Sequence, residues 1–155
     1  MLVGVDTGLL SEAGTPCVAD PGSEIVELAH QNGIRVVPLP GPSSILLALS
    51  ASGFNGQNFA FHGYLPIEKR ERQRKIREIE RAAYDNDQTQ IFIETPYRNK
   101  ALLEALTQTC KPSSRLCLAL NLTTQSEQIF VRSIADWRVS KTDIHKKPAV
   151  FLLYH

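Results

Sequence analysis

Two loops near the start of the sequence combine glycine, proline and small polar residues in a pattern that suits ligand binding. In the first, residues 11–16, Gly14 lets the backbone come close to a ligand because glycine has no side chain. In the second, residues 40–44, Gly41 lies between two prolines and precedes two serines. The pair predicts a binding edge, and ordinary turn chemistry between strand and helix is the alternative reading of either loop alone.

The elements that must position these loops are predicted from the apolar spacing on either side of them. Residues 8–10 suggest the end of a buried strand, and residues 24–30 have helical spacing, with Asp20 as N-cap and Pro21 at the first helical position. Asn32 and Gly33 predict the helix end, and residues 34–39 the next strand. A second helix is expected over residues 45–51, capped by Ser43 or Ser44. Two sequential parallel strands would bring both loops to one edge of the sheet, where open α/β sheets bind ligands.

A carboxylate stands at the end of a third predicted strand. Residues 89–96 are predicted as a strand that ends in Glu94, Thr95 and Pro96, and a helix is expected to follow as far as about Cys110. Arg98 lies four residues after Glu94. The two could orient a substrate, or they could form a surface ion pair or a charge at a helix N-terminus.

The rest of the chain predicts a second α/β unit. Strands are expected over residues 59–65, 115–120, 127–132 and 148–154, with one turn of helix over 133–137. The polar residues 53–58 are the candidate boundary, which gives domains 1–55 and 56–155. The predicted fold class is therefore α/β, with part of a parallel sheet followed by a second domain.

A strongly charged helix is predicted over residues 68–84. Seven lysines and arginines alternate there with four glutamates. Such a helix could follow a phosphate backbone, or it could be a solvated face with ion pairs three or four residues apart. The interleaved glutamates favour the solvated face.

Bulk composition narrows the class of protein. The 155 residues are 43% hydrophobic, enough for a real core, and the formal net charge is +1, so charge alone demands no nucleic-acid or membrane partner. The three cysteines and four histidines have no disulfide or metal-ligand spacing, which predicts no metal. No apolar run is long enough for a membrane span, and the first residues do not resemble a secretory signal. The sequence predicts a soluble, cytoplasmic protein.

Several motifs in one order resemble the tetrapyrrole-methylase-like family of S-adenosyl-L-methionine-dependent methyltransferases. Within the family, they are most similar to the branch that methylates a ribose 2′-hydroxyl in small-subunit ribosomal RNA. The motifs cover nearly the whole chain and are Ser11-Glu12-Ala13-Gly14-Thr15-Pro16, Ala19-Asp20-Pro21-Gly22, Pro38-Leu39-Pro40-Gly41-Pro42-Ser43-Ser44, Phe61-His62-Gly63-Tyr64-Leu65-Pro66, Phe92-Ile93-Glu94-Thr95-Pro96-Tyr97-Arg98 and Asn121-Leu122-Thr123.

The resemblance implies a Rossmann-like first domain, a mixed-sheet second domain, a cofactor cleft between them, and a homodimer. S-adenosyl-L-methionine is the implied cofactor and ribosomal RNA the implied substrate. Glu12 and Glu94 become candidate general bases for a ribose hydroxyl. The implied cofactor-binding residues are Ser11, Glu12, Ala13, Gly14, Thr15, Pro42, Ser43 and Ser44 from the first domain, and Glu94, Thr95, Pro148 and Ala149 from the second.

Departures from the family pattern keep other functions open. The family's first strand and its Gly-Pro-Gly-Asp-like cofactor loop have no counterpart, so the chain is expected to be the C-terminal two-thirds of such an enzyme. It is then expected to bind cofactor weakly and to self-associate through residues 1–50. Glu12 replaces an aspartate, and residues 120–124 lack the Arg, Glu and Lys of the rRNA branch. The alternatives are a non-catalytic nucleotide- or RNA-binding module, or a methylase of a tetrapyrrole-like small molecule.

Overall fold

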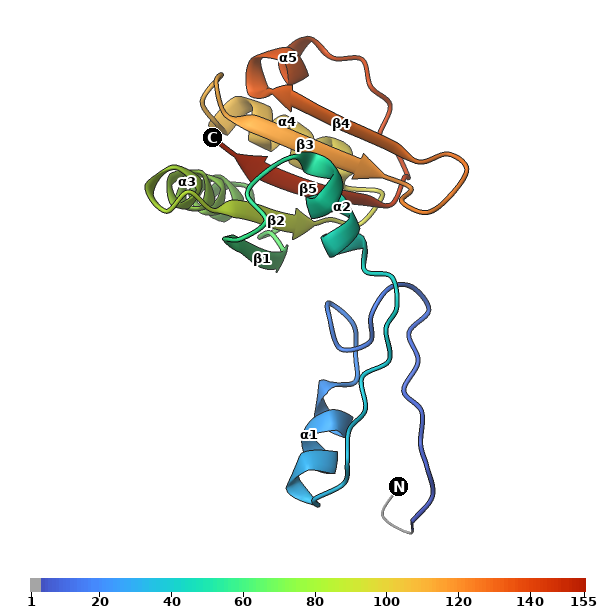
Figure 1. The fold of residues 1–155 in the computed structure, drawn as a ribbon. Coiled ribbons are helices and arrows are strands. Elements are labelled where there is room, and N and C mark those ends of the chain that lie inside the picture. Colours follow the sequence, from blue (N-terminus) through green and yellow to red (C-terminus); the bar gives the residue numbers. More distant parts are fainter. Residues whose placement is uncertain (1–3) are drawn as a thin grey trace. The chain divides into compact units, whose positions relative to one another are not determined.

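The computed structural model describes residues 4–155, and the chain divides into two compact units, Met1–Ser43 and Ser44–His155 (Figure 1). The second unit holds one five-stranded mixed sheet in the order β1-β2-β5-β3-β4. β1 pairs with β2 in parallel, and the other neighbours are antiparallel. The strands are β1 (Phe59–Tyr64), β2 (Thr89–Ile93), β3 (Arg115–Leu120), β4 (Gln128–Ser133) and β5 (Ala149–Tyr154).

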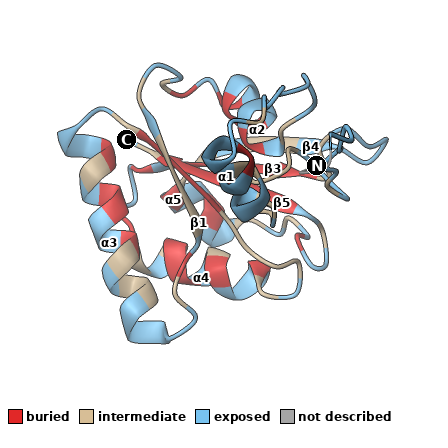
Figure 2. Cartoon of the chain, turned by 90° about the horizontal axis from the view of Figure 1, so that it is seen from below, coloured by how far each residue is buried: buried red, intermediate tan, exposed pale blue. Residues whose placement is uncertain are grey.

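Helices cover both faces of this sheet, because its central strands alternate apolar side chains to either side. On β3, Leu116 and Leu118 belong to the core shared with the helices α3, α4 and α5, whereas Cys117 belongs to the core shared with α2. Few residues of the central strands are exposed to solvent, as the red segments of Figure 2 show. These helices are α2 (Ser44–Ser52), α3 (Lys69–Asp85), α4 (Asn99–Thr109) and α5 (Ile134–Val139).

The strands and helices predicted for residues 56–155 are observed, with ends that differ by a few residues. The predicted division after residue 55 places α2 in the first domain, whereas the compact units divide after Ser43 and place α2 in the second. Ile45, Ala48 and Leu49 of this helix pack against the sheet of the second unit. The division into domains at residue 55 stays a prediction.

The predicted parallel sheet of the first domain is wrong for the described residues. The first unit holds one helix, α1 (Ser23–Gln31), and residues 4–43 form no strand. No backbone hydrogen bond joins residues 8–10 to residues 34–39, and Pro38 and Pro40 lack the N–H that a ladder needs. A strand exists only by pairing, so an apolar run without a hydrogen-bonded neighbour does not become one. Residues 1–3, at the start of the predicted first domain, lie outside the described residues.

The ends of α1 show one wrong prediction and one correct one. Gly22, not Asp20, is the N-cap, with a φ of 125° that favours glycine. A Cβ on Gly22 would lie 2.6 Å from a methyl carbon of Leu9. The helix ends as predicted at Asn32 and Gly33, where the N–H groups of Gly33 and Ile34 donate to the carbonyls of His30 and Ala29, a Schellman arrangement.

Asp87, in the loop after α3, is hydrogen-bonded to residues at the end of β5. Asp87 accepts hydrogen bonds from the Tyr154 hydroxyl and from His155 Nε2, the latter at 2.8 Å. These two hydrogen bonds hold the pKa of Asp87 below its usual range. The bond from Tyr154 has the larger effect and the bond from His155 the second largest. The same contact raises the pKa of Tyr154.

The lowered pKa predicts an acid-dependent loss of stability. A carboxylate whose folded-state pKa is depressed stabilises the fold above its unfolded pKa, and this stabilisation is lost as the pH falls through the folded value. We therefore expect the free energy of unfolding to drop below about pH 4. The Asp87→Asn variant should lack this part of the drop in urea titrations across pH. An identical pH profile for the two proteins would contradict the prediction.

Candidate functional site

The second unit gathers polar side chains at one end of its sheet. Ile93 of β2 pairs with Val150, and Leu120 of β3 pairs with Ala149, so the carboxyl ends of β2 and β3 meet the start of β5. Glu94, Asn121 and Pro148 follow or precede these strands directly. This end of the strands, called the Glu94 edge below, therefore brings together four residues. They are Glu94, Thr95, Pro148 and Ala149, the second-domain residues implied for the cofactor site.

Glu94 and Arg98 form the charged centre of this edge. The Glu94 side chain is only 8% exposed, and both of its oxygens face the Arg98 guanidinium, one through an ion pair and one through a hydrogen bond of 3.2 Å from Nη2. Arg98 Nε also donates to Thr95 Oγ1 at 3.2 Å. Of the alternatives left open for Glu94 and Arg98, the structure shows an ion pair, and the two-point contact suits a group held in a fixed orientation.

A buried asparagine holds the segment that leads into β5. Asn99 is fully buried at the start of α4, and its Nδ2 donates to the carbonyls of Lys147 at 2.7 Å and Ile144 at 3.4 Å. Lys146, in the same segment, donates its N–H to the carbonyl of Pro96 at 3.2 Å. Sequence reasoning missed Asn99, because an asparagine at a helix start ordinarily indicates a cap.

The loop after β3 is tight and has unusual backbone geometry. Asn121 and Thr123 have φ values of 49° and 67°, a region that a β-branched residue such as Thr123 rarely enters. The Asn121 N–H donates to the carbonyl of Pro148 at 3.0 Å, and the Thr123 N–H donates to Glu127 Oε2 at 2.7 Å. Such backbone strain is concentrated at ligand-binding and catalytic edges.

The first unit brings its two predicted loops together without a sheet. Thr15 Oγ1 donates to the carbonyl of Pro42 at 3.4 Å. Ser11 closes its own turn through hydrogen bonds with the backbone of Ala13. Gly14 has a φ of +80°, and nothing lies within 4 Å of the position a Cβ would take. Glu12 is exposed, with no ion pair or side-chain hydrogen bond within residues 4–155.

Two of the three cysteines are buried, which affects their acidity. Burial raises the pKa of Cys117 to about 12 and that of Cys110 above its usual range, so neither thiol is a thiolate nucleophile at neutral pH.

Within residues 4–155, no group of His, Cys, Asp and Glu side chains is arranged to hold a metal ion. None of the helices described is both long and apolar enough to cross a membrane.

Comparison with known proteins assigns the chain to a family. Residues 4–137 match the family described as Tetrapyrrole (Corrin/Porphyrin) Methylases. The chain belongs to this family. The resemblance inferred from the loop motifs is thereby confirmed.

One relative of the chain is the ribosomal RNA small subunit methyltransferase I of Vibrio cholerae. It is 36% identical over 158 residues, and the alignment covers 100% of this chain and 53% of the relative. The chain spans about half the length of the curated relatives it matches.

Solved structures of other methyltransferases share the fold. The methyltransferase CobJ superposes with a TM-score of 0.59 and 22% identity, over 92% of this chain and 62% of that one. The uroporphyrin-III C-methyltransferase of Thermus thermophilus, complexed with S-adenosyl homocysteine, gives a TM-score of 0.52 and 19% identity, over 92% and 63%.

Proposed function

We propose that the chain is part of an S-adenosyl-L-methionine-dependent methyltransferase that methylates a ribose 2′-hydroxyl of small-subunit ribosomal RNA. The observation that carries the proposal is the 36% identity to the Vibrio cholerae rRNA methyltransferase over the whole of this chain. The polar sheet end around Glu94 supports it, because open α/β sheets bind ligands at the carboxyl ends of their strands.

The residues present fit a nucleoside-bearing cofactor. Gly14 offers backbone with open space beside it, and Thr15 holds this loop against Pro42. In the second unit, the carboxylate of Glu94 is held in place by Arg98, which also donates to Thr95 Oγ1 beside it. The proposed cofactor set is Ser11, Glu12, Ala13, Gly14, Thr15, Pro42, Ser43, Ser44, Glu94, Thr95, Pro148 and Ala149. That these two groups face one cleft stays a prediction.

The work left to the chain's own residues is mainly alignment. When bound, the cofactor supplies an activated methyl group with a good leaving group. The protein must hold the acceptor hydroxyl in line and help it lose a proton. Glu12 is exposed and unpaired within residues 4–155, so it is the freer of the two proposed bases. Glu94 is engaged on both oxygens by Arg98, which favours a positioning role for it.

A matched pair of glycine variants tests the cofactor site. Gly14 and Gly33 both have positive φ, at +80° and +64°, and neither has an atom within 4 Å of its Cβ position. Alanine at either place adds similar backbone strain of about 1 kcal/mol. In the full-length protein, Gly14→Ala should weaken S-adenosylhomocysteine binding by about tenfold or more in calorimetry, and Gly33→Ala should not.

The second arm of this experiment addresses the reaction. Transfer of a labelled methyl group to the ribose of small-subunit rRNA is expected with the full-length protein. Cofactor binding without transfer to RNA would instead favour the second candidate, methylation of a tetrapyrrole-like molecule, which the family description supports. If the full-length protein binds no cofactor, the remaining candidate is a non-catalytic nucleotide- or RNA-binding module.

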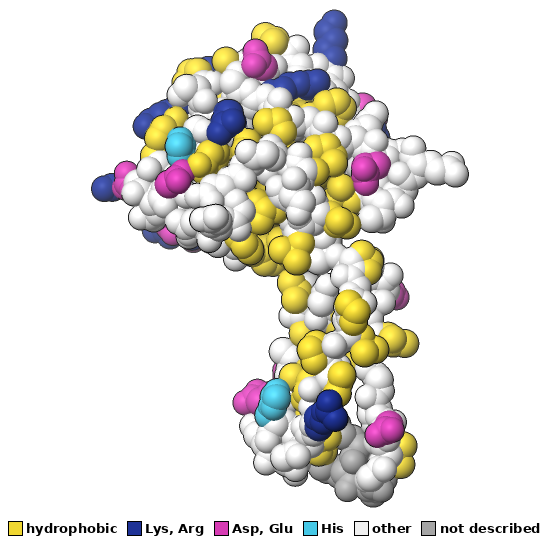
Figure 3. All heavy atoms as spheres, viewed as in Figure 1, with side chains coloured by type: hydrophobic (Ala, Val, Ile, Leu, Met, Phe, Trp, Pro, Cys, Tyr) yellow, Lys and Arg dark blue, Asp and Glu magenta, His cyan; other side chains and the backbone are white. Residues whose placement is uncertain are grey.

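A homodimer is part of the proposal. Large apolar side chains are exposed on α2 and β1 of the second unit, namely Leu46, Leu47, Phe59 and Tyr64. Hydrophobic side chains gather on this unit in the view of Figure 3. Exposed apolar side chains of this kind suit association with another chain.

A further inference from the structure

One face of α3 carries a row of arginines. Arg70, Arg74, Arg77 and Arg81 are spaced four, three and four residues apart, so they lie along a single stripe of the helix. All four are exposed, while Ile76, Ile79 and Ala83 on the opposite side are buried in the core. The stripe spans about 16 Å along the helix axis.

The glutamates of the helix do not neutralise this row. Within residues 4–155, Arg70, Arg74 and Arg77 form no ion pair. Glu78 pairs with Lys75 at 2.6 Å, and only Arg81 of the four is paired, with Asp85 at 3.0 Å. Exposed pairs of this kind are weak and exchange readily for a stronger anionic partner. The stripe is therefore net positive, despite the interleaved acidic residues in the sequence.

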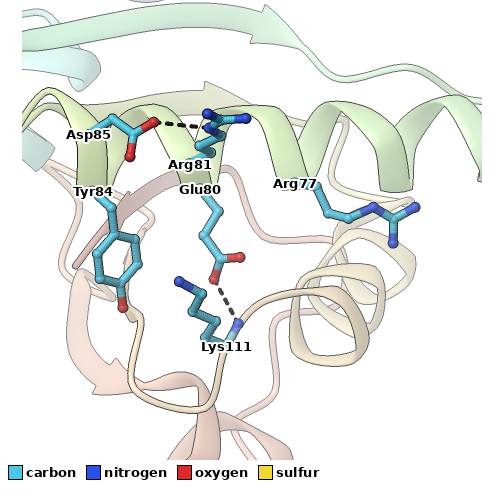
Figure 4. Close-up of a pocket in the computed structure, with 6 residues that line it drawn as sticks. All are labelled: Arg77, Glu80, Arg81, Tyr84, Asp85 and Lys111. Atoms are coloured by element: carbon cyan, nitrogen blue, oxygen red, sulfur yellow. Dashed lines mark hydrogen bonds and ion pairs between the residues drawn. The ribbon is translucent and has the colours of Figure 1, made fainter.

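The stripe runs into a groove that contains an aromatic ring (Figure 4). Glu80 is buried and accepts hydrogen bonds from the Lys111 N–H at 2.7 Å and from Ser114 Oγ at 2.6 Å, which fixes the loop after α4 against α3. This contact places Lys111 Nζ 4.3 Å from the centre of the Tyr84 ring. The groove is lined by Arg77, Glu80, Arg81, Tyr84, Asp85 and Lys111.

The groove lies away from the edge that holds Glu94. It adjoins Ser114, directly before β3 begins at Arg115, and the Tyr84 ring lies 5.4 Å from that of His155, just beyond the end of β5. The Glu94 edge is at the opposite end of the same strands. Six residues of strand separate the two ends by about 20 Å. The groove is therefore a place distinct from the proposed cofactor site.

We propose that the arginine stripe and the Tyr84 groove form a track for single-stranded RNA. Guanidinium groups at regular spacing suit successive phosphates. Tyr84 is 36% exposed, and its ring and the ammonium of Lys111 over it offer an aromatic and a cationic group to an unpaired base. A duplex would bury its base faces and leave the ring without a partner. The identification of the nucleic acid as RNA rests on the proposed function.

Charge reversal in the stripe tests the track directly. In the full-length protein, Arg74→Glu combined with Arg77→Glu should weaken binding of a fluorescein-labelled 12-nucleotide single-stranded RNA by tenfold or more in anisotropy titrations. Its salt dependence should also become shallower, because fewer phosphates are neutralised. The control is Arg35→Glu combined with Lys141→Glu, two exposed cations outside the stripe that give the same change of charge. The control should bind within twofold of the parent.

Tyr84→Ala separates stacking from charge. It should weaken RNA binding about fivefold or more while leaving the salt dependence unchanged. Parental affinity in the double arginine variant, an equal loss in the control, or stronger binding of duplex RNA or of single-stranded DNA would each overturn the proposal. Circular dichroism verifies that each variant is folded. Calorimetry with S-adenosylhomocysteine is run in parallel, so a failed cofactor site and a failed RNA track give different results.

Discussion

Phe151→Ala is expected to lower the free energy of unfolding by about 4 kcal/mol, because it opens a cavity in the middle of the sheet. Phe151 lies on β5, the central strand, and is fully buried. Its ring stacks on that of Phe92 with centroids 5.8 Å apart, and its neighbour across the other ladder is Leu118. Natural domains have about 5–15 kcal/mol of stability in total, so this loss should be visible as a large shift of the urea midpoint.

The single tryptophan gives the measurement. Trp137 is the only tryptophan of the chain, is buried in the same core, and donates its Nε1–H to the carbonyl of Leu116 at 2.9 Å. Its fluorescence therefore reports on the unit that Phe151 stabilises. Ile67→Ala, at a side chain that is 69% exposed, is the control and should cost less than about 1 kcal/mol. Equal losses in the two variants would show that the Phe151 ring does not fill the core as described.

Arg98→Leu is expected to cost about 3 kcal/mol of unfolding free energy, because it leaves a nearly buried carboxylate without its partner. Glu94 has only 8% of its side chain exposed, and both of its oxygens face Arg98. Arg98→Lys keeps the charge but not the two-point contact, so it should lose less. The double variant Glu94→Leu with Arg98→Leu removes both charges and should recover most of the loss.

This cycle also bears on the proposed function. If Glu94 is a positioning residue for the cofactor, Arg98→Lys in the full-length protein should weaken S-adenosylhomocysteine binding even where it remains folded. Additive losses in the stability cycle would mean that the two side chains do not interact. Unchanged cofactor binding in Arg98→Lys would restrict the pair to a structural role.

The second unit was predictable because its sequence signals are local and strong. The apolar run over residues 115–120 and the helical pattern over 68–84 each correspond to an observed element. Glu94 and Arg98 were predicted as a candidate pair from their spacing at a strand end. The motif order also identified the family before any geometry was considered.

The first unit shows where local pattern misleads. Residues 34–39 are apolar enough for a strand, yet strand formation depends on a hydrogen-bonded neighbour that local sequence does not reveal. Asp20 and Pro21 have the residue types of a helix start, but the backbone turns at Gly22 instead. Such choices depend on long-range contacts, here the packing of Leu9 against Gly22.

The sequence by itself determined the family, the elements of residues 44–155 and the residues that could do chemistry, because motif order and apolar periodicity are written along the chain. Only the tertiary structure decided which of them meet. It brought Glu94, Asn121 and Pro148 to one sheet end through the β2, β3 and β5 ladders. It also set Lys111 over Tyr84 through the buried Glu80. Contacts between residues far apart in the chain arise from sheet register and core packing, which no local spacing encodes.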